Sequence, residues 1–275
     1  MKKIIASGMT LLMLTACTDG AANVSKDTEP AEETKEQKEN SDVTEAEQEV
    51  KEETAATEQP EKVVQEPQYK INEANWSVQP IADQNTKVVL LTIDDAPDEH
   101  ALKMAEDLKA LEAPAIFFVN GHFLDTPEEK EVLKKIHEMG FVIGNHTYGH
   151  SSLPDLTPEQ QQEEIRSLND LVESITGERP KFFRAPFGLN TDYSKQIAAE
   201  EKMALMNWTY GYDWEKQYQT KEAITDIMVN SPYLNDGANL LMHDRAWTSE
   251  GLTDIVKGLR KKGYETLDPN KIQTP

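Results

Sequence analysis

The sequence predicts an α/β fold in which about seven parallel strands curl into an irregular (β/α) barrel. Three observations support it. Beyond residue 85, short apolar runs alternate with longer amphipathic stretches, and this order favours a mostly parallel sheet. The apolar runs are continuous, not alternating, which indicates strands covered on both faces. Polar residues capable of chemistry follow these runs, as they do at the carboxyl rim of a parallel barrel.

The individual elements follow from periodicity and from capping signals. Continuous apolar runs predict strands over 88–93, 115–119, 141–143, 181–183, 204–208, 239–242 and 264–267. Apolar residues spaced three and four apart predict helices over 101–112, 128–139, 159–175 and 252–262. The third helix should begin at the capping box Thr157-Pro158-Glu159-Gln160 and stop at Gly177. Gly263 should stop the fourth.

The first residues predict export. Lys2 and Lys3 precede an apolar stretch over 4–14 that is too short to span a bilayer as a helix. Leu14-Thr15-Ala16-Cys17 resembles the lipobox of bacterial lipoproteins, which implies a signal peptide over 1–16 and a lipid on Cys17, the only cysteine. We therefore expect the protein to be lipid-anchored at the extracellular face of the bacterial cell membrane. The alternative is a plain secretory signal followed by an incidental cysteine.

Residues 17–68 predict an acidic, disordered tether. Glu, Lys, Thr, Ala and Gln dominate this segment, which cannot bury enough apolar surface to offset the entropy of ordering. A flexible coil of this length has a mean span on the order of 40 Å. Residues 69–275 are long enough to build one sizeable core, and we expect a single monomeric domain there. The formal net charge of the chain is −22, and without a basic patch nucleic acid is not an expected partner.

Side chains capable of catalysis or metal binding follow successive predicted strands. In chain order they are Asp94 and Asp95, His146 and His150, Arg184, Asp213, and His243. In a parallel barrel the carboxyl ends of different strands share one rim, whereas residues placed only for solubility or helix capping would scatter over both ends. The distribution therefore predicts one functional site.

The stretch GNHTYGH places His146 and His150 four residues apart directly after a predicted strand. We expect both to bind a metal, with one aspartate of the Asp94-Asp95 pair as the third ligand. Two histidines and a carboxylate suit a catalytic zinc site, which keeps positions open for water and substrate. The same trio could hold Fe(II) in an oxygenase. The alternative is that both histidines are hydrogen-bonded loop residues with a structural role. The accompanying acids and His243 argue against this alternative.

Five motifs in this sequence resemble, in family order, those of the polysaccharide deacetylases with a NodB-type domain, carbohydrate esterase family 4. They are Thr92-Ile93-Asp94-Asp95-Ala96-Pro97, His146-Thr147-Tyr148-Gly149-His150, Arg184-Ala185-Pro186-Phe187-Gly188, Asp213-Trp214 and Leu241-Met242-His243. The stretch 117–150 resembles peptidoglycan deacetylase-like members from Bacillus-type bacteria. The resemblance implies the NodB-type deacetylase fold and hydrolytic N-deacetylation of N-acetylated amino sugars, with cell-wall peptidoglycan as the expected substrate.

The resemblance also implies roles for the matched residues. Asp95, His146 and His150 would bind Zn²⁺ or another divalent transition metal, which polarises the acetyl carbonyl and lowers the pKa of bound water toward about 7. Asp94 would accept the water's proton as general base. Arg184 would pair with Asp94 and keep it ionised and oriented, whereas its alternative is a surface ion pair of little value.

Further roles concern the leaving group and the acetyl group. His243 would protonate the departing amine, and Asp213 would orient either His243 or Arg184. The backbone N–H of Phe187 would help to stabilise the tetrahedral oxyanion. Trp214 and Leu241 would shape the acetyl pocket, although a plain core role suits each of them equally well.

Three positions depart from the family pattern. Ala96 stands where glycine is usual, which puts at risk any turn that needs a positive φ there. Phe187 replaces a more frequent tyrosine, and Tyr210 stands where the family often has an acid, three residues before Asp213. The changes at Ala96 and Tyr210 support a competing hypothesis, a deacetylase-like module that binds glycan without turnover. The intact base and acid positions argue against it. Structural or solvent-facing roles are expected for the remaining histidines, His100, His122 and His137.

Overall fold

The structure is a computed structural model that describes residues 66–275. The predicted signal peptide, Cys17 and the predicted tether as far as residue 65 lie outside the described residues. Within the described part, no helix combines the length and hydrophobicity required to cross a bilayer.

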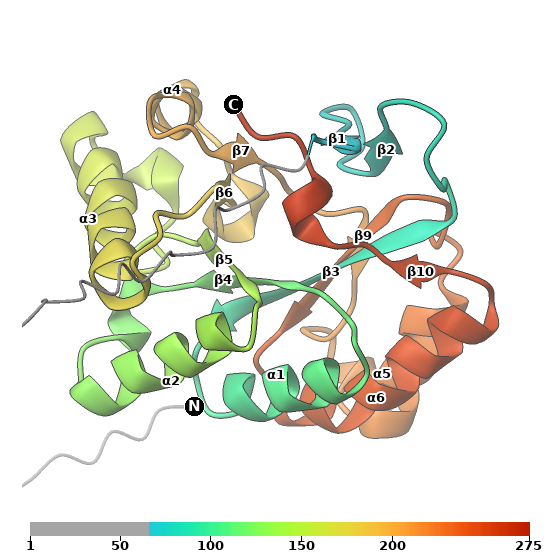
Figure 1. Ribbon diagram of the computed structural model, residues 1–275. Helices are drawn as coiled ribbons and strands as arrows, with labels where there is room; N and C mark the ends of the chain where they lie inside the picture. The colour runs from blue at the N-terminus through green and yellow to red at the C-terminus, as the bar shows by residue number, and fades with distance from the viewer. Residues whose placement is uncertain (1–65) are drawn as a thin grey trace, which may run out of the picture. The chain divides into compact units, whose positions relative to one another are not determined.

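One parallel sheet forms the centre of the domain (Figure 1). Its strands run in the order β7 (Ala204–Leu205), β6 (Phe182–Phe183), β5 (Val142–Asn145), β4 (Ile116–Val119), β3 (Val88–Ala96), β9 (Ala238–His243) and β8 (Tyr210–Gly211). Off this path, β10 (Glu265–Thr266) pairs with the start of β3. Every pairing in this sheet is parallel. The predicted fold class is confirmed.

Strand β3 is the long central strand, and eight of its nine residues are buried. It is covered on both faces, as its continuous apolar sequence predicts. The register determines what meets at its carboxyl end. Asp94 lies beside His243 of β9, and Ala96 lies beside Val119 of β4. The polar residues that follow these strands therefore come together at one rim of the sheet.

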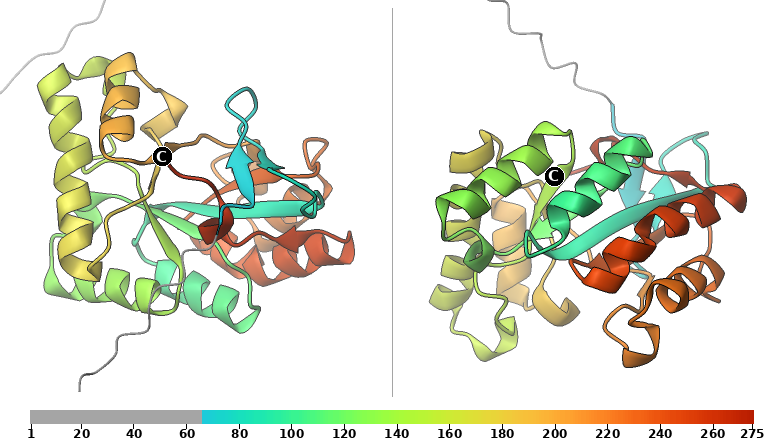
Figure 2. Two further views of the ribbon diagram at one scale, coloured as in Figure 1. Left: turned by 45° about the horizontal axis from the view of Figure 1, so that its top comes forward. Right: turned by 90° about the horizontal axis from the view of Figure 1, so that it is seen from below.

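Helices cover the outer face of the sheet. They are α1 (Ala101–Ala110), α2 (Pro127–Glu138), α3 (Pro158–Thr176), α5 (Lys221–Asn230) and α6 (Ala246–Lys261), and Figure 2 shows α1 and α6 lying along the sheet. The largest buried cluster lies between them and the sheet and includes Leu91, Ile93, Leu252 and Leu259. As predicted, α3 begins at a capping box between Thr157 and Gln160 and ends at the left-handed Gly177.

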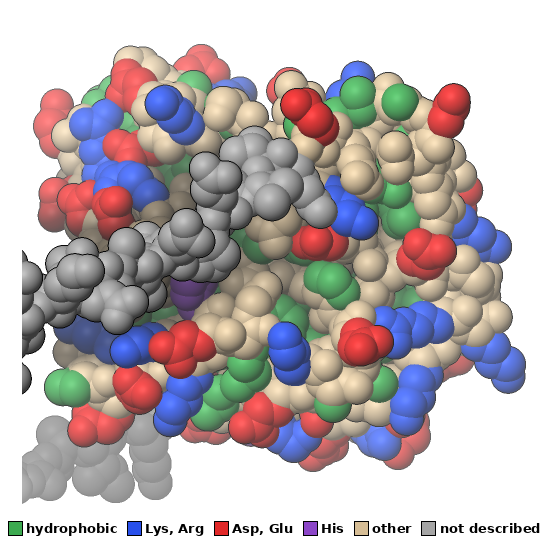
Figure 3. Space-filling model, in the orientation of Figure 1, with side chains coloured by type: hydrophobic (Ala, Val, Ile, Leu, Met, Phe, Trp, Pro, Cys, Tyr) green, Lys and Arg blue, Asp and Glu red, His purple; other side chains and the backbone are tan. Residues whose placement is uncertain are grey.

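The inner face of the sheet is covered by a different set of elements. Strands β1 (Tyr69–Ile71) and β2 (Val78–Pro80) form an antiparallel hairpin, which Figure 1 shows on the side opposite to α1 and α6. A second buried cluster joins this hairpin and the end of the chain to inward-facing strand residues such as Leu90 and Phe118. On the surface seen in Figure 3, acidic and basic side chains are interspersed, which lessens the self-repulsion of an acidic chain.

Several elements differ from the sequence prediction. The hairpin, β8, α4 (Asp192–Glu200) and α5 were not predicted. The predicted strand 204–208 is wrong beyond Leu205, because residues 206–209 leave β7 and connect the two edge strands of the sheet. Side chains hold this connection in place: the Asn207 carbonyl accepts hydrogen bonds from Arg184 and Asn239. As a consequence, Asp213 follows β8 and not the predicted strand.

Candidate active site

A pocket of about 660 Å³ lies at the carboxyl ends of the central strands. Apart from Arg184, which is buried behind Asp94, all the predicted catalytic, metal and pocket residues line it. Two further residues, Trp208 and Arg245, complete its wall. The full lining is Asp94, Asp95, His146, His150, Phe187, Trp208, Asp213, Trp214, Leu241, His243 and Arg245.

Asp94 and Arg184 form a buried pair at the end of β3. Arg184 is fully buried and donates through Nη1 to Asp94 Oδ1 (2.6 Å) and to Thr92 Oγ1 (2.8 Å). Its guanidinium also lies over the ring of Phe118, 4.3 Å from the ring centroid. A surface ion pair would be screened by solvent, but this one is inside the protein and has fixed geometry. Arg184 therefore holds the Asp94 carboxylate in one orientation.

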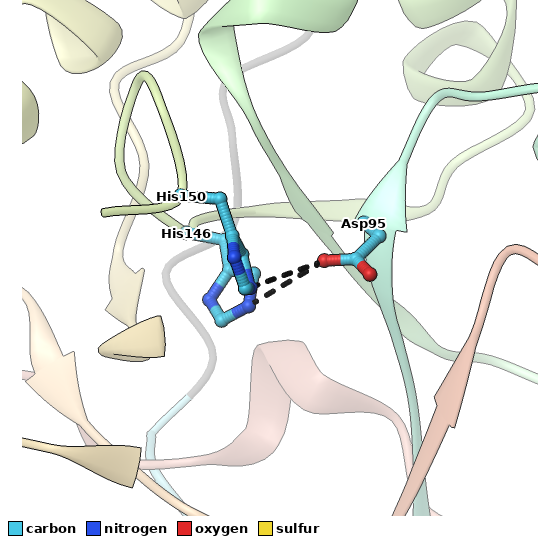
Figure 4. Close-up of side chains that lie close together, drawn as sticks. All are labelled: Asp95, His146 and His150. Atoms are coloured by element: carbon cyan, nitrogen blue, oxygen red, sulfur yellow. Dashed lines mark ion pairs between the residues drawn. The ribbon is translucent and has the colours of Figure 1, made fainter. Parts of the chain in front are cut away.

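Asp95, His146 and His150 turn one atom each toward a common point (Figure 4). Asp95 Oδ1 lies 3.4 Å from His150 Nε2 and 3.9 Å from His146 Nε2. Two ligand atoms about 2.1 Å from one ion at the tetrahedral angle are about 3.4 Å apart, so the spacing suits a shared ion. Asp95 Oδ1 is also buried, and no group in the described part of the chain hydrogen-bonds to it. This set of atoms fits a divalent transition metal.

A backbone carbonyl orients the ring of His146. His146 Nδ1 lies 2.7 Å from the carbonyl oxygen of Arg184, so a proton on Nδ1 leaves the Nε2 lone pair directed at the common point. Burial lowers the pKa of His146. Burial alone would raise the pKa of Asp95, but the neighbouring His243, His146, His150 and Arg245 lower it on balance. Neutral histidine and ionised carboxylate are the forms that bind metal.

Side chains from two other parts of the fold hold the loop that carries the two histidines. The Asn120 amide donates to the carbonyls of His146 (2.6 Å) and Thr147 (3.1 Å). On the other side, the Glu164 carboxylate of α3 accepts the N–H of Gly149 at 2.7 Å. These contacts fix the loop that follows β5, so the positions of the histidines do not depend on the metal alone.

Left-handed backbone is concentrated at this site. Four of the seven described non-glycine residues with positive φ lie in the motifs: Asp95 (57°), Thr147 (67°), His150 (55°) and Phe187 (59°). Such conformations cost free energy and persist where surrounding contacts enforce them. Ala96 is not among them and is buried at the end of β3. The concern that this position needs glycine is therefore wrong, because the left-handed residue is the preceding one.

Asp213 contacts His243 and not Arg184, which decides the alternative left open by the sequence. Its Oδ1 lies 2.6 Å from His243 Nδ1, and its Oδ2 accepts the His243 N–H at 2.6 Å and the Thr248 hydroxyl at 2.8 Å. Burial alone would lower the pKa of His243, but the hydrogen bond and charge of Asp213, with Asp94 and Asp95, raise it on balance. The pair favours a protonated imidazole beside the pocket.

Aromatic and aliphatic side chains complete the walls. Phe187 is 61% exposed, and its ring stands edge-on to His150 with centroids 4.8 Å apart. Trp214 is 49% exposed and perpendicular to the His243 ring at 5.6 Å, so neither is a core residue. Leu241 is buried but still lines the pocket. A β-carbon at Gly211 would lie 2.5 Å from the Leu241 carbonyl oxygen and 2.9 Å from the Trp214 ring, which explains glycine there.

The remaining histidines and Tyr210 lie away from the pocket lining. His100 is the N-cap of α1, His122 Nδ1 lies 3.0 Å from the Tyr148 carbonyl, and His137 of α2 lies 3.9 Å from Glu178. Tyr210 is buried, and its hydroxyl donates to the Met228 carbonyl at 2.7 Å. Tyrosine at this position therefore links β8 to α5.

Comparison with known proteins agrees with this geometry. A family model described as polysaccharide deacetylase matches residues 81–232, more than half of the 275 residues. The chain belongs to the polysaccharide deacetylase family. This deacetylase-family chain is 30% identical over 194 residues to the peptidoglycan-N-acetylmuramic acid deacetylase PdaC of Bacillus subtilis, an alignment that covers 70% of the chain and 40% of PdaC. It is 28% identical over 199 residues to a peptidoglycan-N-acetylglucosamine deacetylase of Bacillus cereus, covering 69% and 70%.

Solved structures give the same family fold. The structure of PdaC from Bacillus subtilis is similar with a TM-score of 0.60 at 28% identity, covering 68% of this chain and 90% of that one. A CE4 family pseudoenzyme from Bacillus anthracis is similar with a TM-score of 0.60 at 27% identity, covering 66% and 63%. The deacetylase-family fold thus occurs in a neighbour described as a pseudoenzyme as well as in one described as a deacetylase.

The sequence did not identify Arg245 as part of the site. It follows β9 directly after Asp244, and its Nη2 donates to Asp95 Oδ2 at 2.7 Å. Its place just beyond the carboxyl end of a strand is the same signal that identified the other residues. Trp208 was also missed, because it was assigned to the end of a predicted strand as one of its apolar residues.

Proposed function

We propose that the protein is a metal-dependent N-deacetylase of N-acetylated amino sugars, with cell-wall peptidoglycan as its substrate. One observation carries the proposal. Within a single pocket, an aspartate held by a buried arginine and a histidine held by a buried aspartate lie in register on neighbouring strands, beside the Asp95-His146-His150 trio. This arrangement provides a base, an acid and a metal site for one amide bond.

The proposed reaction is hydrolysis of the acetamide. Asp95, His146 and His150 would hold a divalent metal such as Zn²⁺, which would supply the Lewis acidity for polarising the acetyl carbonyl and activating water. Asp94 accepts a proton from the attacking water, while Arg184 keeps its carboxylate oriented. Water oxygen bonds to the carbonyl carbon, the C–N bond breaks, and acetate and an amine are released.

Other residues stabilise and complete this reaction. The Phe187 N–H donates to the oxyanion that forms on the carbonyl oxygen. His243, kept protonated by Asp213, gives a proton to the leaving nitrogen, which is otherwise a very poor leaving group. Trp214 and Leu241 contact the methyl of the acetyl group. The exposed ring faces of Phe187 and Trp214 also suit contact with a sugar ring.

A second candidate function is glycan binding without turnover. The similarity to a CE4 family pseudoenzyme favours it, since the fold is compatible with loss of activity. The ordered pairs Asp94–Arg184 and His243–Asp213 favour the enzyme. A pure binding module has no need for a buried arginine that fixes one carboxylate or for an acid that holds one imidazole.

Acetate release tests the proposal. Full-length protein loaded with Zn²⁺ should release acetate from peptidoglycan or from N-acetylglucosamine oligomers, chelator treatment should abolish the release, and added Zn²⁺ should restore it. Protein treated with chelator and reloaded is its own matched control. If metal-loaded protein binds these glycans and releases no acetate from any of them, the binding module replaces the enzyme.

We also propose that a lipid on Cys17 anchors the protein at the extracellular face of the bacterial cell membrane. The support is the lipobox-like Leu14-Thr15-Ala16-Cys17 and the single cysteine. One residue bearing more than one acyl chain is sufficient for stable anchoring. Cys17→Ser should release the protein from the membrane fraction, and unchanged fractionation would contradict the anchor.

A further inference from the structure

Each carboxylate in the pocket has its own cationic partner. Asp94 pairs with Arg184, and Asp213 pairs with His243. The partner of Asp95 is Arg245, whose Nη2 lies 2.7 Å from Asp95 Oδ2. Arg245 lines the pocket but belongs to none of the five sequence motifs.

The Arg245 side chain is held from both sides. Its Nη1 donates to the Asp244 carbonyl at 2.8 Å, while Nη2 donates to Asp95 near the carboxyl end of β3. Asp244 is itself buried and rigidly placed, because its carboxylate accepts the N–H groups that lead into α1: Asp98 (2.7 Å), His100 (2.7 Å) and Ala101 (2.9 Å). The guanidinium is therefore anchored on the same junction of β3, β9 and α1 that carries Asp95.

Asp95 is a residue whose orientation needs such a support. Its backbone is left-handed, with φ 57°, and its two carboxylate oxygens have different surroundings. Oδ2 accepts from Arg245, whereas Oδ1 is buried, has no hydrogen-bond partner among residues 66–275 and faces His146 and His150. Without a partner on Oδ2, the carboxylate could turn either oxygen, or both, toward the histidines.

We propose that Arg245 is a positioning residue that holds Asp95 Oδ2 and so presents Oδ1 alone to the metal. The proposal rests on the metal site of the proposed function. On this basis, removing Arg245 should weaken metal binding. Electrostatic repulsion alone predicts the opposite, because removing a nearby cation would tighten metal binding. The guanidinium is partly exposed and its charge is screened by water, so we expect its geometric role to dominate. Loss of a group that orients a metal ligand typically lowers metal affinity about 10- to 100-fold.

Metal affinity of the full-length protein, measured without substrate, tests this role. Competition with a coloured chelator should show Zn²⁺ binding about 10- to 100-fold weaker in Arg245→Ala. Arg245→Lys, which retains the charge, and Arg245→Gln, which retains one donor, should both be intermediate. Arg260→Ala is the matched control, because Arg260 lies on α6 and contacts the carbonyls of Leu111 and Glu112. It should bind Zn²⁺ like the wild type.

Cobalt substitution gives an independent readout. The visible spectrum of bound Co²⁺ depends on how the carboxylate coordinates, so it should change in Arg245→Ala and remain unchanged in Arg260→Ala. If Arg245→Ala fails to fold, the Lys and Gln variants decide the question. Equal or tighter Zn²⁺ binding in the Arg245 variants overturns the positioning role alone. Wild-type protein that binds no metal overturns the metal assignment and this proposal together.

Discussion

The two sides of the pocket are organised in different ways. On the acid side, Asp213 and His243 are hydrogen-bonded to each other, and the Thr248 hydroxyl donates a further hydrogen bond to the Asp213 carboxylate. On the metal side, Asp95 Oδ1 is buried without a hydrogen-bond partner among the described residues, and both Asp95 and His150 have left-handed backbone. The acid side is complete within the protein, whereas the metal side has the features of a ligand-binding site. Substitutions on the metal side should therefore remove bound metal, whereas substitutions on the acid side should lower activity and leave the metal content unchanged.

Removing a metal ligand should have the largest effect. His146→Ala or His150→Ala should lower bound metal from about one ion per chain to near zero and abolish acetate release, because two ligands hold a divalent ion poorly. Metal analysis and acetate assays measure both. His137→Ala is the control and should retain metal, since His137 lies on α2 away from the pocket lining. Equal metal loss in all three variants would indicate general unfolding.

Removing the acid should have a smaller effect and a different signature. His243→Ala should lower kcat by about 100- to 10,000-fold, the usual contribution of a general acid, with metal content unchanged. The metal should stay bound because His243 hydrogen-bonds to Asp213 and not to the trio. Loss of metal together with activity would show that the two sides are not independent.

Asp213→Asn should move the pH profile. Asp213 contributes to the raised pKa of His243, so protonated His243 persists to higher pH than an ordinary histidine. Activity that needs this proton falls as pH rises through the raised pKa. Without the Asp213 charge the pKa falls, and the alkaline limb of kcat against pH should shift to lower pH. Asp170→Asn, a surface control, should leave the limb in place; an unshifted limb in Asp213→Asn would separate Asp213 from the acid.

Tyr210→Phe should show the smallest effect. Its hydroxyl only links β8 to α5 through the Met228 carbonyl, so its loss should cost about 1 kcal/mol of unfolding free energy. Thermal or denaturant unfolding measures this, and kcat should remain unchanged. A large loss of kcat would show that Tyr210 takes part in the reaction, in the place of the acid that the family often has at this position.

The sequence predicts those parts of the site that depend on strand order. Residues at the carboxyl ends of β3, β5 and β9 meet because parallel strands share one rim, and the capping box of α3 is a local signal. The partner of Asp213 could not be predicted, because it depends on where β8 begins after the connection from β7. The role of Ala96 depends on backbone angles, and that of Arg245 on a contact across 150 residues. Backbone angles leave no local pattern in the sequence. Arg245 does lie just beyond a strand end, as the other site residues do, but its partner is set by the tertiary fold.

The central claim is that an aspartate beside the metal site acts as the base of a hydrolase. The Asp94→Asn variant tests this claim most directly. The variant retains an oxygen that can accept the Arg184 hydrogen bond, so fold, metal content and glycan affinity should match the wild type. Acetate release should fall about 100- to 10,000-fold, and the double variant with His243→Ala should lose less than the product of the single losses. Acetate release at the wild-type rate from Asp94→Asn, with metal still bound, would contradict the account.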